Sequence, residues 1–231
     1  MIGRRNLNEE TSPLTPLRRP RAAVAPLVAT ESSFLEAVAE LGSGEGVLAV
    51  DAERASGYRY HSHSYLFQFY RRRSRIFLID PIPFRGNQKV IEAFNEAFID
   101  ETWVIHASTQ DLPCIREFGL NPRKLFDTEL GARLAGLPKV GLGPLAEELL
   151  HLSLAKEHSA VDWSIRPLHP EWRAYAALDV DVLIDLYDEV LRILTSQGKE
   201  RIAHQEFQAI LKSPPPSPRK DPWRRTSRMH K

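Results

Sequence analysis

The sequence predicts an α/β domain with a mixed five-stranded sheet and helices on both of its faces. The first observation behind this prediction is the order of the elements, in which three strand-like segments precede segments that alternate between helical and strand periodicity. The second is that acidic residues end or follow several strands, as expected where such a sheet gathers functional side chains at one edge. With 231 residues, 42% of them hydrophobic, the chain can form one such domain with a sizeable core.

The first elements are a helix and a three-stranded meander. Thr30 is a candidate N-cap for a helix that ends before the first strand. Residues 47–53 alternate as a strand does, and residues 65–70 and 76–79 predict two more strands. The short basic turn 71–75 joins the last two, so we expect the three strands to pair in antiparallel order.

The remaining elements alternate between helix and strand before the chain ends in helices. In the first of these helices, Val90, Ile91, Phe94 and Phe98 recur at helical spacing. Short apolar runs followed by capping residues predict the strands. The predicted helices are 87–99, 111–118, 127–134, 171–194 and a short one reaching 212, and the predicted strands are 103–105 and 125–126.

Both ends of the chain are basic and rich in proline. Residues 1–30 hold five Arg against two Glu, and residues 212–231 hold seven Lys or Arg against one Asp, so the tails carry +9 and residues 31–211 carry −8. We expect residues 1–29 to be a disordered arm, residues 30–212 the folded domain and residues 213–231 a stiff linker. Such arms attract a polyanion or serve only as solubilising linkers.

The composition excludes several classes of protein. Cys114 is the only cysteine, so the chain has no disulfide framework and no cysteine-rich zinc site. The first residues are too polar for a signal peptide, and no run approaches the roughly 20 apolar residues that span a bilayer. We therefore expect a cytoplasmic protein without a membrane partner, and the sequence identifies no protein partner.

Carboxylates stand where the pattern calls for apolar residues. Asp51 and Glu53 lie on one face of the first strand, where two like charges repel unless a cation lies between them. Asp179 lies on the apolar stripe of the last long helix, one turn after Tyr175. Because buried carboxylates are costly without a counter-charge, these groups predict bound metal, and oxygen ligands favour Mg²⁺ or Mn²⁺ over zinc.

Three motifs occur in order at these positions: Asp-x-Glu at 51–53, His-Ala-x-x-x-Asp at 106–111 and Tyr-x-x-x-Asp at 175–179. Over about residues 30–195 the chain resembles the ribonuclease D group of the DEDD superfamily of 3′-to-5′ exonucleases. Asp80-Pro81, Asp127-Thr128 and Asp162-Trp163 with Arg166-Pro-Leu also match that group. The tyrosine of the third motif is typical of the tyrosine branch of the superfamily.

The resemblance implies an RNase H-like fold and a 3′-to-5′ exoribonuclease that trims structured RNA precursors, such as tRNA, from a single-stranded 3′ end. It implies that four carboxylates bind two divalent ions and that Tyr175 orients the attacking water. The ligands would be Asp51, Glu53, Asp111 and Asp179. Two further residues are candidate substrate contacts: His106, at a strand end, for the terminal nucleotide, and Arg166 for a phosphate.

The chain departs from the group in one respect, since ribonuclease D proteins carry C-terminal HRDC helical domains. The basic segment 221–231 resembles the lead-in to such a domain, so we expect a fragment or a truncated member. Two other functions stay open. One is a nucleic-acid-binding module that kept the fold and lost catalysis, and the other is the same hydrolysis acting on DNA, because the sequence has no clear reader of the 2′-hydroxyl.

Overall fold

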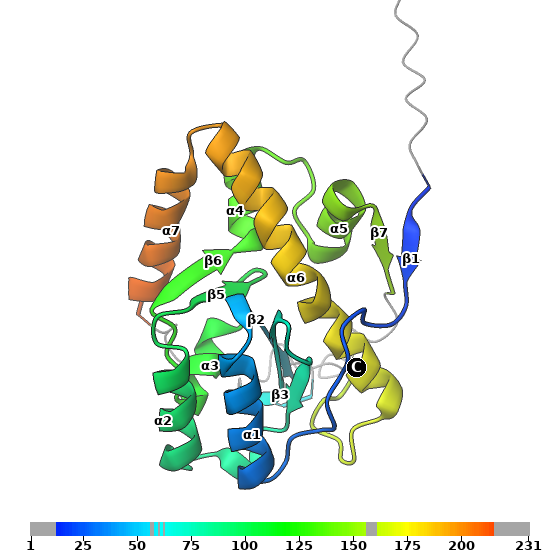
Figure 1. The fold of residues 1–231 in the computed structure, drawn as a ribbon, viewed down its shortest axis with the longest axis vertical. Helices are drawn as coiled ribbons and strands as arrows, with labels where there is room; N and C mark the ends of the chain where they lie inside the picture. The colour runs from blue at the N-terminus through cyan, green and yellow to red at the C-terminus, as the bar shows by residue number, and fades with distance from the viewer. Residues whose placement is uncertain (1–12, 56–57, 60, 62, 156–160, 215–231) are drawn as a thin grey trace, which may run out of the picture.

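A five-stranded mixed sheet forms the centre of the molecule (Figure 1). The computed structural model describes residues 13–55, 58–59, 61, 63–155 and 161–214. The strands follow the order β4-β3-β2-β5-β6, in which β2, β3 and β4 are antiparallel and β5 and β6 run parallel to β2. This arrangement confirms the predicted sheet and meander. The strands are β2 (Glu45–Arg54), β3 (Ser64–Arg72), β4 (Phe77–Ile79), β5 (Thr102–Ile105) and β6 (Lys124–Asp127).

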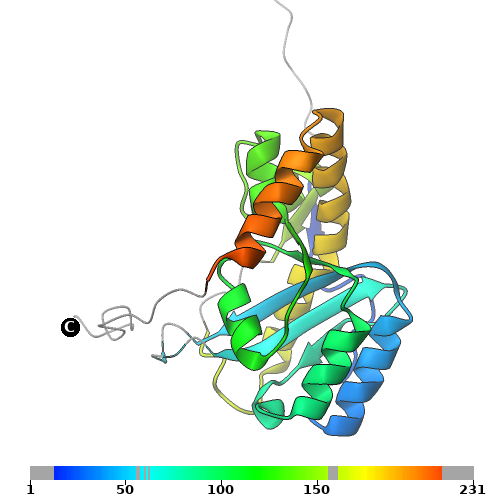
Figure 2. The ribbon, with the colours of Figure 1, turned by 90° about the vertical axis from the view of Figure 1, so that its left-hand side faces the viewer.

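Helices cover both faces of this sheet, as predicted. In Figure 2, α1 (Glu31–Gly42) and α2 (Gln88–Ala97) lie below the sheet, and α7 (Glu200–Lys212) and the C-terminal part of α6 (Pro170–Ser196) lie above it. Phe34, Phe69, Phe94 and Trp103 form a chain of ring contacts in the core on the α1 and α2 side. The other helices are α3 (Leu112–Phe118), α4 (Thr128–Ala135) and α5 (Leu142–Leu150).

The register of β2 decides where its acidic residues point. Asp51 lies opposite Gln68 of β3, and Ala52 lies opposite Phe67. Because successive residues of a strand face opposite sides, Asp51 and Glu53 share one face while Ala52 faces the aromatic core. Helix α6 crosses the sheet above the acidic face and contacts β2 and β3. The fold thus brings the Asp-x-Glu motif and the long helix together.

Residues 13–29 are ordered, so the prediction of a disordered arm was wrong for this part of the chain. β1 (Thr15–Leu17) pairs in parallel with β7 (Leu152–Leu154), and single bridges join Val24 to Ile76 and Val28 to Ile79. Val28 is buried in the core. The proline-rich composition suggested disorder, but backbone groups of this segment form hydrogen bonds with neighbouring strands. Residues 1–12 lie outside the described residues.

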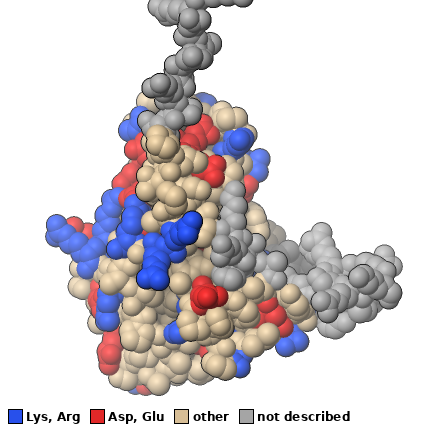
Figure 3. Space-filling view, turned by 90° about the vertical axis from the view of Figure 1, so that its right-hand side faces the viewer, with Lys and Arg blue, Asp and Glu red and all other residues tan. Residues whose placement is uncertain are grey.

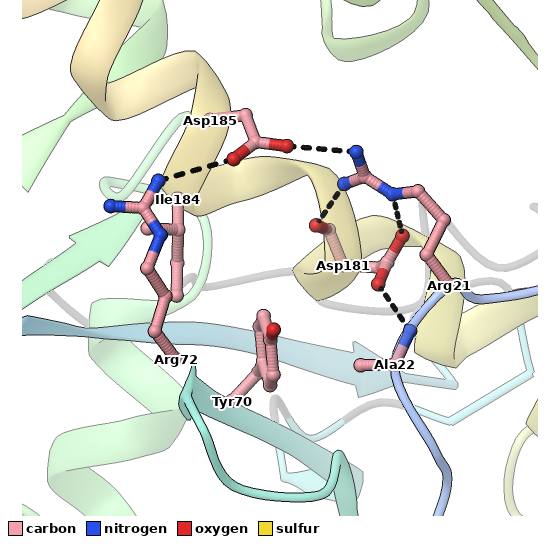
Figure 4. A pocket seen from close by; sticks show the side chains of 7 residues that line it. All are labelled: Arg21, Ala22, Tyr70, Arg72, Asp181, Ile184 and Asp185. Atoms are coloured by element: carbon pink, nitrogen blue, oxygen red, sulfur yellow. Dashed lines mark hydrogen bonds and ion pairs between the residues drawn. The ribbon is translucent and has the colours of Figure 1, made fainter. Parts of the chain in front are cut away.

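The N-terminal segment, residues 13–29, is also fixed to α6 by ion pairs. Arg21 Nε lies 2.7 Å from Asp181 Oδ2, and Arg21 Nη1 lies 2.8 Å from Asp185 Oδ2. The backbone N–H of Ala22 donates to the same Asp181 carboxylate at 3.1 Å (Figure 4). Asp181 is almost fully buried, so Arg21 supplies the counter-charge that such a group needs. We call these contacts the Arg21 clamp.

The expected C-terminal linker lies almost entirely outside the described residues, which end two residues after α7. Residues 215–231 are among those not described, so the linker and the domain it would lead to remain predictions. Among the helices of the described residues, none has the length and apolar character needed to cross a membrane.

Candidate metal centre and active site

Three carboxylates from two distant parts of the chain meet at the end of β2. One oxygen each from Asp51, Glu53 and Asp179 can be chosen so that all three lie within 4.8 Å of one another. The first two come from alternate positions of β2, and the third comes from the turn of α6 that crosses above them. The structure therefore brings together the two motifs that were predicted to converge.

Asp111 completes the group from a third element. It is 5% exposed, immediately precedes α3, and its carboxyl group lies next to that of Asp51. Arg54 Nη2 lies 3.1 Å from Asp111 Oδ1, so the residue after the Asp-x-Glu motif turns back toward the cluster. We call Asp51, Glu53, Asp111 and Asp179 the carboxylate cluster.

The electrostatics of the carboxylate cluster favour a cation. Burial raises the pKa of all four carboxyl groups, most strongly those of Glu53, Asp111 and Asp179. The negative charge of Asp51 raises the pKa values of the other three further. The positive charge of Arg54 acts in the opposite direction on Asp51, Glu53 and Asp111. Among the described residues of this site, the acids therefore outnumber the arginine that opposes their charge.

This donor set fits a hard divalent cation. All the available ligand atoms are carboxylate oxygens, which Mg²⁺ and Mn²⁺ prefer. Asp51, Glu53 and Asp179 would hold such an ion directly, and Asp111 stands beside Asp51 to take part in the same ion or a neighbouring one. A cation would relieve the repulsion that raises these pKa values.

The raised pKa values predict how pH acts on stability. A carboxyl whose pKa is higher in the folded state binds more protons when folded, so stability falls as pH rises from its ordinary pKa of about 4 toward the raised pKa. We expect the melting temperature of the protein in EDTA to fall between about pH 5 and 8, and Mn²⁺ to restore it. Thermal unfolding followed by circular dichroism measures both. A Glu53→Gln variant should show a flatter pH profile, and an unchanged profile would show that the half-buried carboxyl of Glu53 is not a source of the pH dependence.

Tyr175 lies one turn before Asp179 on α6 and is half-buried. Burial raises the pKa of its phenol, and the charges of Asp179, Glu53 and Asp51 raise it further. The phenol is therefore neutral at pH 7, where it can donate a hydrogen bond and accept another. This character suits a group that orients a water molecule.

His106 stands at the end of β5, as predicted, but its ring bonds to the neighbouring strand end. Its Nδ1 lies 2.9 Å from Thr128 Oγ1, at the start of α4. Burial lowers the pKa of the imidazole, and the charges of Asp127 and Glu129 oppose that effect. The ring is thus a largely neutral, partly exposed group, and its contact with a terminal nucleotide stays a prediction.

Arg166 has a structural role, which leaves no donor for the phosphate contact expected from the sequence. Its Nε and Nη2 bind the two oxygens of Asp80 at 2.7 and 2.9 Å. The other N–H groups donate to the carbonyls of Trp163, Ile165 and Tyr65. A guanidinium has five N–H donors, and all five are used within the protein. We therefore withdraw the assignment of Arg166 to substrate.

Sequence reasoning missed two polar residues beside the carboxylate cluster. Arg54 is the counter-charge that the repulsion between Asp51 and Glu53 called for, and its place directly after the motif was the available signal. Gln68 was interpreted as core, and it is fully buried. Its amide lies opposite Asp51 in the register and has no hydrogen-bond partner among the described residues. Gln68 stands between Phe67 and Phe69 in the sequence, and this pattern gave no indication that it lies beside the carboxylate cluster.

The sequence and the fold of the chain are similar to those of known proteins. Residues 26–195 match the profile of a family described as 3′-5′ exonuclease. The exosome complex exonuclease RRP6 of Saccharomyces cerevisiae is 30% identical over 177 residues, which are 75% of this chain and 24% of that protein. A ribonuclease D of Xanthomonas oryzae is 36% identical over 126 residues, which are 54% of this chain and 34% of that protein.

A solved structure has a similar fold. The crystal structure of a protein from Bifidobacterium adolescentis is 43% identical and superimposes with a TM-score of 0.86, covering 94% of this chain and 53% of that chain. The chain thus spans about a quarter to a third of the two curated relatives and about half of this structure. The matched family region includes all four carboxylates and Tyr175.

Proposed function

Because the chain belongs to the 3′-5′ exonuclease family, and because its fold gathers four carboxylates and a tyrosine near the end of β2, we propose that it is a metal-dependent 3′-to-5′ exoribonuclease. Its substrate would be the single-stranded 3′ end of an RNA, with structured precursors such as tRNA as the natural class. Two Mg²⁺ or Mn²⁺ ions would bind at the carboxylate cluster. The observation that carries this proposal is the convergence of Asp51, Glu53 and Asp179 from β2 and α6.

In this reaction the carboxylates and Tyr175 would have different roles. Bound divalent ions supply a nucleophile at neutral pH and stabilise the charge of the leaving oxygen. Asp51, Glu53, Asp111 and Asp179 hold those ions, and their own negative charge keeps an unneutralised phosphodiester away. The neutral phenol of Tyr175 accepts a hydrogen bond from the attacking water and fixes its direction. The RNA would be shortened from its 3′ end by one nucleotide in each catalytic cycle.

Tyr175→Phe tests the role of the phenol. We expect kcat to fall by about a hundredfold, because one positioned hydrogen bond to the reacting water is lost while every metal ligand remains. The affinity for Mn²⁺, measured by calorimetry, should not change. Tyr187→Phe is the matched control, since this tyrosine lies on the same helix but packs on Phe126. Equal rates for the two variants would remove Tyr175 from the mechanism.

Matched RNA and DNA strands test the substrate class. We expect the protein with Mn²⁺ to shorten a 3′-hydroxyl RNA faster than the DNA of the same sequence, and to leave a 3′-phosphorylated strand intact. Faster shortening of DNA would assign the chain to the DNA exonucleases. A gel shift of RNA without any shortening would support the alternative of a binding module that has lost catalysis.

A further inference from the structure

A basic cavity adjoins the proposed active site. It has a volume of about 700 Å³, lies between the N-terminal segment and the first turns of α6, and includes Tyr175 in its wall. Arg18 and Arg19 line it from the N-terminal segment and Arg173 lines it from α6, while Glu171 is the one acidic residue among the described residues of its wall. Most of the remaining wall is apolar. A cavity of this size accommodates a ligand as large as a nucleotide.

The three arginines of the basic cavity differ from Arg21 and Arg72 nearby in having no counter-ion among the residues that the structure describes. None of their guanidinium groups forms an ion pair with a described residue, and the buried Nε of Arg173 has no hydrogen-bond partner there. By contrast, Arg21 and Arg72 nearby are paired with aspartates of α6. An unsatisfied buried donor costs free energy, and no contact among the described residues offsets that cost at the Nε of Arg173. The rest of the guanidinium is partly exposed, and its N–H groups can bind an anion.

The position of Arg173 on its helix supports the same interpretation. It lies in the first turn of α6, which begins at Pro170. The N-terminus of a helix carries a partial positive charge, so stability alone favours an acidic residue there and disfavours an arginine. A phosphate bound at this end would interact favourably with both the helix and the arginine.

The fold holds Arg18 and Arg19 in place rather than on a loose arm. The pairing of β1 with β7 fixes the chain just before them, and the Arg21 clamp fixes it just after them (Figure 4). The entropy of ordering these residues is therefore lost on folding and not on binding, which favours affinity. Figure 3 shows the face on which the N-terminal segment lies, with Lys and Arg side chains gathered near its middle.

We propose that the basic cavity binds the phosphates of the nucleic-acid strand next to the 3′ nucleotide being removed. This inference rests on the proposed function, because Tyr175 belongs both to the wall of the cavity and to the surroundings of the carboxylate cluster. The carboxylates repel the strand at the point of cleavage, and three arginines beside them offset that repulsion. Because several arginine side chains line one cavity, consecutive phosphates of a strand fit it better than a single free anion does.

Strand binding measured without cleavage tests the proposal. In an Asp179→Asn background, Arg18, Arg19 and Arg173 are replaced together by Gln, and fluorescence anisotropy with a 3′-hydroxyl RNA 12-mer is recorded over a NaCl series. We expect Kd at low salt to rise about tenfold or more. The slope of log K against log salt should become shallower by about 2, since each single-strand phosphate contact contributes about 0.7.

A second triple variant separates a local site from net charge. Arg123, Arg192 and Arg201 are exposed and do not line the basic cavity, so replacing them with Gln removes the same charge elsewhere. We expect this variant to keep nearly the slope of the background protein. Equal slopes and affinities for the two triple variants would overturn the proposal. If the cavity triple variant does not fold, Arg19→Gln and Arg173→Gln singly should each reduce the slope by about 0.7.

A parallel digestion keeps this proposal distinct from the one on which it rests. If the unmodified protein shortens no strand in Mg²⁺ or Mn²⁺, the proposed exonuclease function fails whatever the binding data show. If it shortens RNA while the two triple variants bind alike, only the basic-cavity proposal fails.

Discussion

Asp179→Asn is expected to slow the shortening of a 3′-hydroxyl RNA by about a thousandfold or more. Asp179 is one of the three residues whose oxygens converge at the end of β2, and a bound metal contributes several kcal/mol to the stabilisation of the transition state. Since 1.36 kcal/mol corresponds to a factor of ten, losing most of that contribution gives a loss of this size. Gel analysis of a 5′-labelled strand measures it.

The same substitution should not harm the fold. Repulsion and burial raise the pKa of Asp179, so an amide of the same shape removes an unfavourable charge from the metal-free protein. We expect the melting temperature in EDTA at pH 7.5 to be unchanged or higher. Asp188→Asn is the control, because this exposed aspartate on the same helix pairs only with Arg72 among the described residues. An active Asp179→Asn protein would exclude Asp179 as a ligand.

Asp80→Asn is expected to lower the free energy of unfolding by about 3 kcal/mol. The Asp80 side chain, 9% exposed, holds the guanidinium of Arg166, 26% exposed, through two hydrogen bonds. Removing one partner of a buried ion pair leaves the other charge without compensation, which costs about 3–5 kcal/mol, and partial exposure of Arg166 favours the lower end. Urea unfolding in EDTA measures the difference without any contribution from metal.

Glu40→Gln provides the matched control for Asp80→Asn. Arg75 binds both oxygens of Glu40 in the same two-pronged geometry, but the Arg75 side chain is 47% exposed and that of Glu40 is 30% exposed. Exposed pairs contribute about 1 kcal/mol or less, so this variant should unfold almost as the unmodified protein does. Similar losses in the two variants would show that burial does not set the strength of the Arg166 pair.

Much of the fold and of the site could be predicted because local pattern and tertiary role agree. The alternation in β2 placed Asp51 and Glu53 on one face, and the apolar stripe of α6 pointed Asp179 toward the sheet. The mixed sheet and its antiparallel meander are confirmed, and the RNase H-like exonuclease fold follows from the family to which the chain belongs. Periodicity is informative for these elements because each buries one face.

Other features depend on contacts between distant residues that no local pattern encodes. The N-terminal segment was expected to be disordered, yet pairing with β7 and the Arg21 clamp order residues 13–29. Arg166 was a reasonable phosphate ligand by charge alone, until the structure placed Asp80 against it. Arg54 was overlooked because its partner in the ion pair, Asp111, lies far along the chain. In each case the partner decides the role of the arginine.

A time course on one 5′-labelled, 3′-hydroxyl RNA would decide whether the carboxylate cluster uses divalent metal to cleave from the 3′ end. We expect a ladder that shortens by one nucleotide at a time with Mn²⁺ or Mg²⁺ and stops on addition of EDTA. Cleavage within the strand, shortening that persists in EDTA, or no shortening with either metal would contradict a metal-dependent 3′-to-5′ exonuclease.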